Sequence, residues 1–236
     1  VRVPERGTLR TLCEMVDKNA AEQAKRYKIN TERTEGTLAR LSELLGIETY
    51  PARIEAYDIS NLGKEHLTAG MIVCREGKFS KADYRSFSIR SVLDGTDDYA
   101  SMREALDRRL EHLSDGEGSF GKIPDLILLD GGRGHVGVVR ELMAERGLDI
   151  PVFGMVKDDR HRTRALVTPE GREIRIDNNQ AIFALIGNIQ EETHRFAITY
   201  HRNLRSKRLR YSELDGILGI GPKRKQDLLR SFRSIS

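Results

Sequence analysis

The stretch Asp125-Leu126-Ile127-Leu128-Leu129-Asp130-Gly131-Gly132 decides the fold predicted for this chain of 236 residues. Its apolar run, Leu126–Leu129, is typical of a central strand that is buried on both faces of a parallel sheet. A helix is predicted at about 134–146, and a further strand follows at Val152–Val156. This alternation of strand, helix and strand predicts a parallel crossover connection.

The region upstream predicts three strands with short connections. The candidates are Ile54–Ile59, Ala69–Arg75 and Tyr84–Ile89. Gly63 and the Glu76-Gly77-Lys78 segment supply turns between them, which favours an antiparallel meander. A helix over about Asp97–Leu113 then leads to the central strand. Three meander strands followed by helix, strand, helix and strand predict an α/β, ribonuclease H-like mixed sheet flanked by helices.

The two ends of the chain are predicted to be helical. Two N-terminal helices are expected over residues 8–28 and 31–46, the second of which is stopped by Gly46. A hairpin over 165–176 precedes a last long helix over about Asn179–Tyr200. We therefore expect three parts, which are an N-terminal helical segment at 1–50, a ribonuclease H-like domain at 51–203, and a basic linker with a small helix-hairpin-helix unit at 204–236.

Positive charge is concentrated near the end of the chain. Residues 201–236 hold 10 Lys or Arg against 3 Asp or Glu, whereas the whole chain has a net charge of +4 at pH 7. A basic tail on a near-neutral body is a common arrangement for nucleic-acid binding, with a solubilising surface as the alternative. Charged residues make up 32% of the chain, but they are mixed in sign and interrupted by apolar runs, which excludes a wholly disordered chain.

No segment predicts a membrane location. The sequence lacks an apolar stretch of the roughly 18 residues that a transmembrane helix needs, and it lacks the pattern of a signal peptide. Its two cysteines, Cys13 and Cys74, cannot build a framework of disulfides. We therefore expect a reduced, cytoplasmic protein without a structural zinc site.

The basic tail contains the signal of a helix-hairpin-helix unit, in which Leu-Gly-Ile-Gly-Pro separates two short helical segments. Gly219 and Gly221 would let backbone N–H groups approach a DNA phosphate, and positive residues follow at the start of the next helix. These positive residues are Lys223, Arg224 and Lys225. Such contacts bind the DNA backbone without reading its sequence. An ordinary pair of helices is the alternative, and we expect the unit to be truncated because the chain stops soon after it.

Two carboxylates are predicted to meet at one edge of the sheet. Asp58 closes the first strand and Asp130 closes the central strand, so neighbouring strands would bring them together. Paired carboxylates repel each other unless a cation lies between them, and Mg²⁺ or Mn²⁺ suits carboxylate oxygens. His194 can join them if the last helix crosses this edge. The alternatives are that each Asp caps a turn and that His194 is an ordinary helix residue.

Positive residues follow the strand Val152–Val156, close to the same edge. Lys157 could meet a phosphate there, and Arg162 and the basic tail would also hold DNA, with a solvated loop as the alternative. Other chemistries have little support. The sequence lacks the Gly-rich motifs of nucleotide-binding loops and the Gly-x-Ser-x-Gly motif of serine hydrolases, and neither cysteine has a His nearby in sequence.

Several motifs, spread in order over about residues 50–230, resemble the C-terminal half of the UvrC family, the incising subunits of the bacterial nucleotide excision repair excinuclease. The motifs are Ile54–Ser60, Asp97–Met102, Asp125–Gly132, His161–Thr163, Thr193–Ile198, His201-Arg202 and Gly219–Arg224. The resemblance implies an Asp-Asp-His catalytic set, which maps onto Asp58, Asp130 and His194. It also implies a further functional acid, at Asp97 or Asp98, without choosing between them.

The same resemblance implies metal-dependent hydrolysis of a DNA phosphodiester on the 5′ side of a lesion, in a system that includes UvrA and UvrB. In the family, the nuclease for the 3′ incision and the UvrB-binding segment lie upstream, so we expect this chain to be a fragment without them. Arg133 and His135 stand where we expect Lys and Gln. Two other hypotheses stay open, namely another ribonuclease H-like nuclease of the resolvase or transposase type, and a non-catalytic DNA-binding scaffold.

Overall fold

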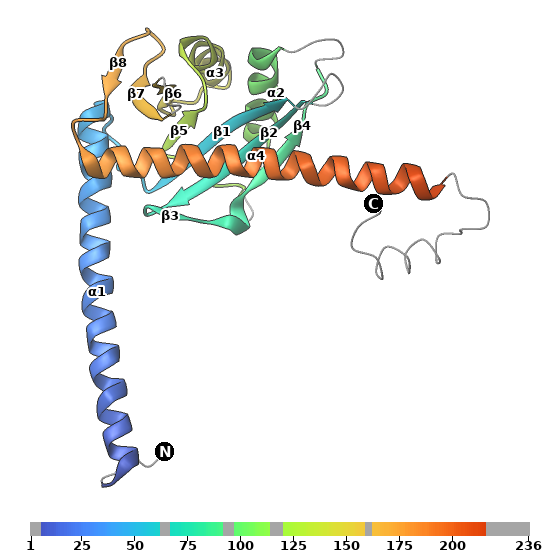
Figure 1. Ribbon diagram of the computed structural model, residues 1–236. Coiled ribbons are helices and arrows are strands. Elements are labelled where there is room, and N and C mark those ends of the chain that lie inside the picture. Colours follow the sequence, from blue (N-terminus) through green and yellow to red (C-terminus); the bar gives the residue numbers. More distant parts are fainter. Residues whose placement is uncertain (1–5, 62–66, 92–96, 114–119, 159–161, 216–236) are drawn as a thin grey trace.

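A mixed sheet forms the centre of the protein in the computed structural model, which describes residues 6–61, 67–91, 97–113, 120–158 and 162–215 (Figure 1). The strands are β1 (Arg53–Asn61), β2 (Leu67–Arg75), β3 (Lys78–Phe79), β4 (Arg85–Ser88), β5 (Leu126–Leu129), β6 (Val152–Lys157), β7 (Thr163–Val167) and β8 (Glu173–Arg175). The helices are α1 (Thr8–Leu45), α2 (Asp98–Glu111), α3 (Arg133–Glu145) and α4 (Gln180–Asp215), with a short 3₁₀ helix η1 (Lys81–Asp83).

The strand order confirms the predicted ribonuclease H-like sheet. The eight-stranded sheet runs β3-β2-β1-β5-β6-β7-β8, and β4 also pairs with β2. β1 is antiparallel to β2 and parallel to β5, and β5 is parallel to β6. The hairpin of β7 and β8 extends the sheet in the antiparallel sense beyond β6. The carboxyl ends of β1, β5 and β6 therefore meet at one edge.

The predicted third strand, Tyr84–Ile89, corresponds to β4, but an additional short strand, β3, precedes it and was not predicted. β3 and β4 both pair with β2, and η1 separates them. A side-chain hydrogen bond favours this interruption, because Ser80 Oγ donates to Asp83 Oδ2 at 2.7 Å. Such local bonds compete with the regular ladder of a strand.

The sheet separates two hydrophobic cores. α2 and α3 pack on one face, and α4 with the C-terminal end of α1 packs on the other (Figure 1). Side chains alternate between the faces, since Tyr57 of β1 lies in the core under α2 and α3, whereas Ala56 lies in the core under α4. By the same alternation, Asp58 lies on the α4 face.

The N-terminal segment is a single helix, so the prediction of two helices is wrong. α1 continues through Ile29 and Asn30 because neither residue breaks a helix, and it ends at Gly46 in the left-handed conformation with φ 67°. Leu38, Leu41 and Leu45 are buried in the core under α4. Towards its N-terminus, α1 projects away from the sheet (Figure 1), and the side chains of Leu9 and Val16 are exposed.

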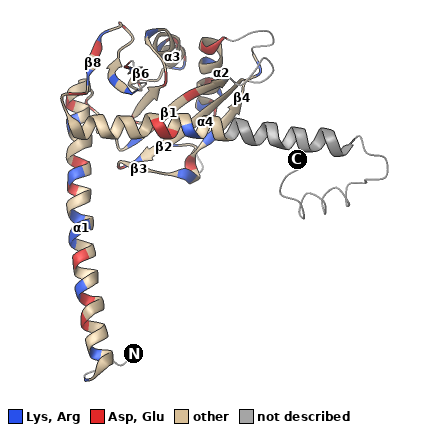
Figure 2. Ribbon diagram, in the orientation of Figure 1, with Lys and Arg blue, Asp and Glu red and all other residues tan. Residues whose placement is uncertain are grey.

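Paired charges support the projecting part of α1. Figure 2 shows positive and negative residues interspersed along it. Ion pairs one turn apart join Arg10 to Glu14 at 2.9 Å and Arg26 to Glu22 at 2.6 Å. Each such pair adds a few tenths of a kcal/mol (about 0.2–0.5) to an exposed helix.

The last helix is longer than predicted. It continues past the expected end near Tyr200 to Asp215, so it runs through the stretch expected to be a linker and across the proposed division at 203/204. The stretch Arg202–Tyr211 contains no Gly or Pro, the two residues that most disfavour the interior of a helix. Among the described residues, no helix is long and apolar enough to cross a membrane.

Gly154 of β6 is packed so closely that we predict a loss of stability when a side chain is added there. A Cβ there would lie 2.3 Å from Gly131 O and 2.9 Å from Val167 Cγ1. Because a backbone oxygen cannot move aside freely, Gly154→Ala should lower the free energy of unfolding by about 1–3 kcal/mol in urea denaturation. Gly187→Ala in α4 is the control, since a Cβ at Gly187 meets nothing within 4 Å. Equal stability of both variants would contradict this prediction.

Candidate metal centre

The structure brings Asp58, Asp130 and His194 together. One potential ligand atom from each residue lies within 4.8 Å of the other two. The two carboxylates are neighbours because β1 and β5 pair in parallel, with Tyr57 opposite Leu129. Asp58 directly follows Tyr57, and Asp130 directly follows Leu129, the last residue of β5. Asp130 N donates to Tyr57 O at 2.8 Å, which continues the pairing to the edge of the sheet.

His194 reaches the carboxylates because α4 lies close to the sheet. α4 packs over β1 and β2 (Figure 1), and Gly70 of β2 stands directly opposite Asp58. A Cβ at Gly70 would lie 3.0 Å from Ala197 Cβ, so the absence of a side chain allows the helix to approach. His194 Nδ1 lies 3.0 Å from Asp58 Oδ2 as a result.

The two carboxylates are largely buried, with side-chain exposures of 10% for Asp58 and 7% for Asp130. Burial and the negative charge of Asp130 raise the pKa of Asp58 to about 6, while His194 and then Lys157 oppose this rise. The surrounding protein groups therefore compensate the negative charge of this pair incompletely. Two buried carboxylates and an imidazole at this spacing fit a divalent cation with hard oxygen ligands.

Lys157 lies at the acidic pair itself. Its Nζ is 2.8 Å from Asp130 Oδ1 and 2.8 Å from Asp130 Oδ2. The sequence predicted that this lysine contacts a phosphate, and the contact with Asp130 was not predicted. The alternation along β6 could have indicated it, because Phe153 and Met155 face α4 and Lys157 follows in the same series.

Arg162 lies in the neighbouring connection between β6 and β7. Its guanidinium Nη2 is 3.2 Å from Asp158 Oδ2, and its backbone N donates to Asp158 Oδ1 at 2.8 Å. Asp158 N also donates to Arg162 O at 2.7 Å. These bonds hold the start and end of the connection together, and the Arg162 side chain stays exposed.

Asp97 and Asp98 differ in what they contact. Asp97 caps α2, because its Oδ1 accepts a hydrogen bond from Ala100 N at 2.9 Å. Asp98 lies in the first turn of α2, where its charge acts on His135. Burial lowers the pKa of His135, and the charges of Asp98 and then Asp130 oppose this. The charges of Asp98 and Asp130 thus act on the same imidazole, whereas Asp97 has a local capping bond.

The remaining predicted DNA-binding residues cannot be placed at this site. Gly219, Gly221, Lys223, Arg224 and Lys225 lie outside the described residues. The helix-hairpin-helix unit therefore stays a prediction.

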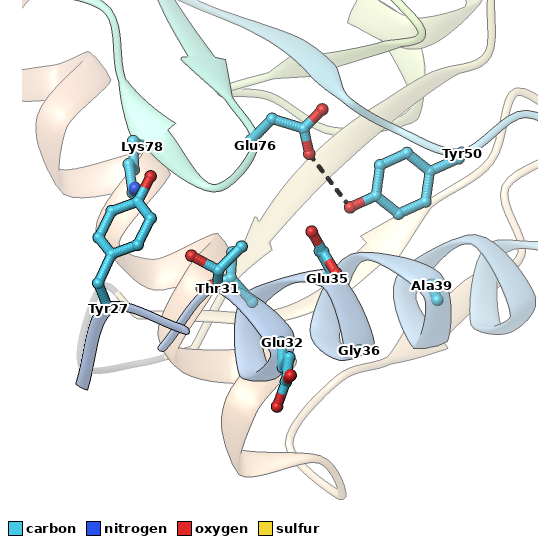
Figure 3. A pocket seen from close by; sticks show the side chains of 10 residues that line it. Tyr27, Thr31, Glu32, Glu35, Gly36, Ala39, Tyr50, Glu76 and Lys78 are labelled. Carbon is cyan, nitrogen blue, oxygen red and sulfur yellow. Dashed lines mark hydrogen bonds between the residues drawn. The ribbon is translucent and has the colours of Figure 1, made fainter. Parts of the chain in front are cut away.

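A separate pocket lies where α1 meets the turn between β2 and β3 (Figure 3). It has a volume of about 790 Å³, and its lining includes Tyr27, Glu35, Glu76 and Lys78. Tyr50 OH donates to Glu76 Oε2 at 3.2 Å across it. None of the residues predicted to take part in catalysis or DNA binding lines this pocket.

The strand order and the helices on both faces define a ribonuclease H-like domain. The family described as UvrC RNAse H endonuclease domain matches residues 42–198. The chain belongs to this family, as the motifs in its sequence predicted.

Longer relatives of the chain are named UvrABC system protein C. The chain is 44% identical over 239 residues to the UvrABC system protein C of Clostridioides difficile, and the match covers 100% of this chain and 38% of that protein. It is 43% identical over 251 residues to the UvrABC system protein C of Clostridium acetobutylicum, covering 100% and 40%. The chain thus spans about two fifths of the length of these relatives.

A weaker likeness exists to a solved structure of Ciona intestinalis endonuclease V in complex with a 24mer DNA. The sequences are 15% identical, the TM-score is 0.37, and the match covers 58% of this chain and 59% of that one. A likeness at this level transfers no function.

Proposed function

We propose that this chain is the part of a UvrC protein that hydrolyses a DNA phosphodiester on the 5′ side of a lesion in nucleotide excision repair. The observation that carries the proposal is the cluster of Asp58, Asp130 and His194 at the sheet edge of a domain in this family. Its partners would be damaged duplex DNA and UvrB, with UvrA acting earlier, and its location would be the bacterial cytoplasm.

Asp58 and Asp130 would hold Mg²⁺ or Mn²⁺, and His194 would complete the ligand set or transfer a proton. When bound, the cation would activate water for attack on the phosphodiester and stabilise the charge that develops on the phosphate. The hydrogen bond between His194 and Asp58 orients both side chains, which lowers the cost of ordering them around a cation. Asp98 is the better candidate for a further functional acid, because the carboxylate of Asp97 already caps α2.

Positive groups beside the metal centre would hold the DNA backbone. Lys157 and Arg162 lie on either side of the connection that follows β6, and Lys157 contacts Asp130. The basic tail, with Gly219, Gly221, Lys223, Arg224 and Lys225, would add phosphate contacts that do not depend on sequence. DNA binding by these groups would weaken as salt concentration rises.

Calorimetric titration of the 236-residue chain with Mn²⁺ tests the metal site. We expect saturable binding that is lost in the double variant Asp58→Ala/Asp130→Ala, because the variant removes both carboxylate ligands. The matched control is Asp149→Ala/Asp177→Ala, which removes two carboxylates whose partners, Arg140 and Arg175, lie on the surface. Equal Mn²⁺ binding by the site variant and the unchanged chain, with and without a DNA duplex, would contradict the proposal.

A further inference from the structure

Lys157 shields one side of the carboxylate pair. Its ammonium contacts both oxygens of Asp130 at 2.8 Å. The Lys157 side chain is nevertheless 32% exposed. The ammonium group can therefore leave Asp130 by rotating about its own side-chain bonds, without any change in the sheet.

A divalent cation at this site would need oxygens that Lys157 already engages. Asp130 offers its two carboxylate oxygens, and both contact the lysine. An ammonium and a divalent cation on one carboxylate repel each other, and this repulsion is strong where water is largely excluded. Binding of the cation must therefore move Lys157 away from at least one oxygen of Asp130.

We infer that Lys157 is an internal counter-cation, which a divalent metal displaces from Asp130 and which then binds a phosphate of the DNA. This inference rests on the proposed metal site. A lysine suits the exchange because its charge is compact and its four-carbon stem is flexible. The first half of the exchange is the release of Lys157 by the metal, and the second half is the binding of Lys157 to a phosphate. Together they couple metal binding to DNA binding, because DNA stabilises the ammonium that the metal releases. Lys157 thus acts as a positioning residue that links the metal centre to its substrate.

Mn²⁺ titration of Lys157→Met, without DNA, tests the first half of the exchange. Methionine keeps an unbranched apolar side chain and removes the charge. We expect its Kd for Mn²⁺ to fall by about fivefold or more, the lower end of typical coupling factors. Lys25→Met, on the exposed part of α1, makes the same change of charge away from the site and should leave the Kd unchanged.

Fluorescence anisotropy with a short labelled DNA duplex tests the second half. In the unchanged chain, saturating Mn²⁺ should lower the Kd for DNA. The factor should equal the one by which saturating DNA lowers the Kd for Mn²⁺, because such coupling is reciprocal. In Lys157→Met this gain should be smaller by about fivefold. The duplex is checked on a denaturing gel, so that cleavage is not mistaken for dissociation.

Each outcome identifies the idea that fails. If Asp58→Ala/Asp130→Ala binds Mn²⁺ like the unchanged chain, the proposed metal site is wrong. If that variant loses Mn²⁺ while Lys157→Met binds it no more tightly than the unchanged chain, the site stands and the counter-cation is overturned. If Lys157→Met binds Mn²⁺ more tightly but gains as much DNA affinity from Mn²⁺ as the unchanged chain does, the transfer of Lys157 to a phosphate is overturned.

Discussion

Asp58→Asn and Asp130→Asn will each lower DNA incision by at least about a thousandfold. A bound cation contributes several kcal/mol of stabilisation to the transition state of phosphodiester hydrolysis, and each 1.4 kcal/mol corresponds to about a factor of ten in rate. Asparagine has the shape of aspartate but lacks its charge, so it holds a divalent cation poorly. DNA binding without a divalent cation should persist, because the positive residues proposed to contact the DNA backbone are unchanged.

The measurement is incision on the 5′ side of a lesion by a reconstituted UvrABC system. Its UvrC subunit would be a chimera, in which this chain replaces the matching segment of the Clostridioides difficile relative. Asp149→Asn serves as the control, since this carboxylate is exposed and its partner is Arg140 on the surface. Normal incision by Asp58→Asn or Asp130→Asn would refute the assignment of the site, whereas loss of DNA binding measured without a divalent cation would indicate misfolding.

Arg109→Met is expected to lower the free energy of unfolding by about 3 kcal/mol, because it leaves the buried carboxylate of Glu55 short of a partner. Arg109 and Glu55 are 1% and 0% exposed. Glu55 accepts hydrogen bonds from Arg109 Nη2 at 2.8 Å, from Arg53 Nη2 at 2.8 Å and from Tyr57 OH at 2.7 Å. Arg109 also donates to the backbone oxygens of Phe120 at 2.6 Å and Lys122 at 2.7 Å, so the variant also frees these carbonyl groups.

Urea denaturation of the purified variants measures this loss. The double variant Glu55→Gln/Arg109→Met should recover part of the stability, since it removes the charge that the single variant leaves unpaired. Arg140→Met is the control, because its partner Asp149 is exposed and surface ion pairs contribute about 1 kcal/mol or less. A loss for Arg109→Met no larger than for Arg140→Met would show that the buried network adds little to stability.

The sheet could be predicted from the sequence because the apolar composition of its strands indicates that they are buried. Leu126–Leu129 is apolar throughout, and all four residues are buried in the structure. The ends of the chain could not be predicted as well, because helical spacing does not show whether an apolar stripe is covered. Leu9 and Val16 lie at helical spacing, as Leu38 and Leu41 do, yet they are 65% and 64% exposed.

The part of the candidate site that is formed by strand ends could be predicted from the sequence. The contacts that depend on side-chain packing could not. The ends of two adjacent parallel strands place Asp58 beside Asp130, and the order of elements was sufficient to expect this. The contact of Lys157 with Asp130 depends on side-chain directions at the end of β6. The difference between Asp97 and Asp98 depends on a capping hydrogen bond, which two adjacent acids in a sequence do not reveal.

The buried network around Glu55 was not predicted at all. A glutamate in a strand and an arginine near the end of a helix are usually surface residues, and their sequence separation gives no sign that they meet. Burial of both follows from the packing of α2 against β1, which places the guanidinium of Arg109 on the carboxylate of Glu55.

The unbroken helix α4 has a mechanical consequence for what lies along its length. It carries His194 at the candidate metal centre and runs on without interruption to Asp215. At a rise of 1.5 Å per residue, that part of the helix spans roughly 30 Å. This is close to one turn of B-form DNA, about 34–36 Å. The helix is thus a spacer of fixed length, and under the proposed function its end at Asp215 would lie about one DNA turn from the candidate metal centre.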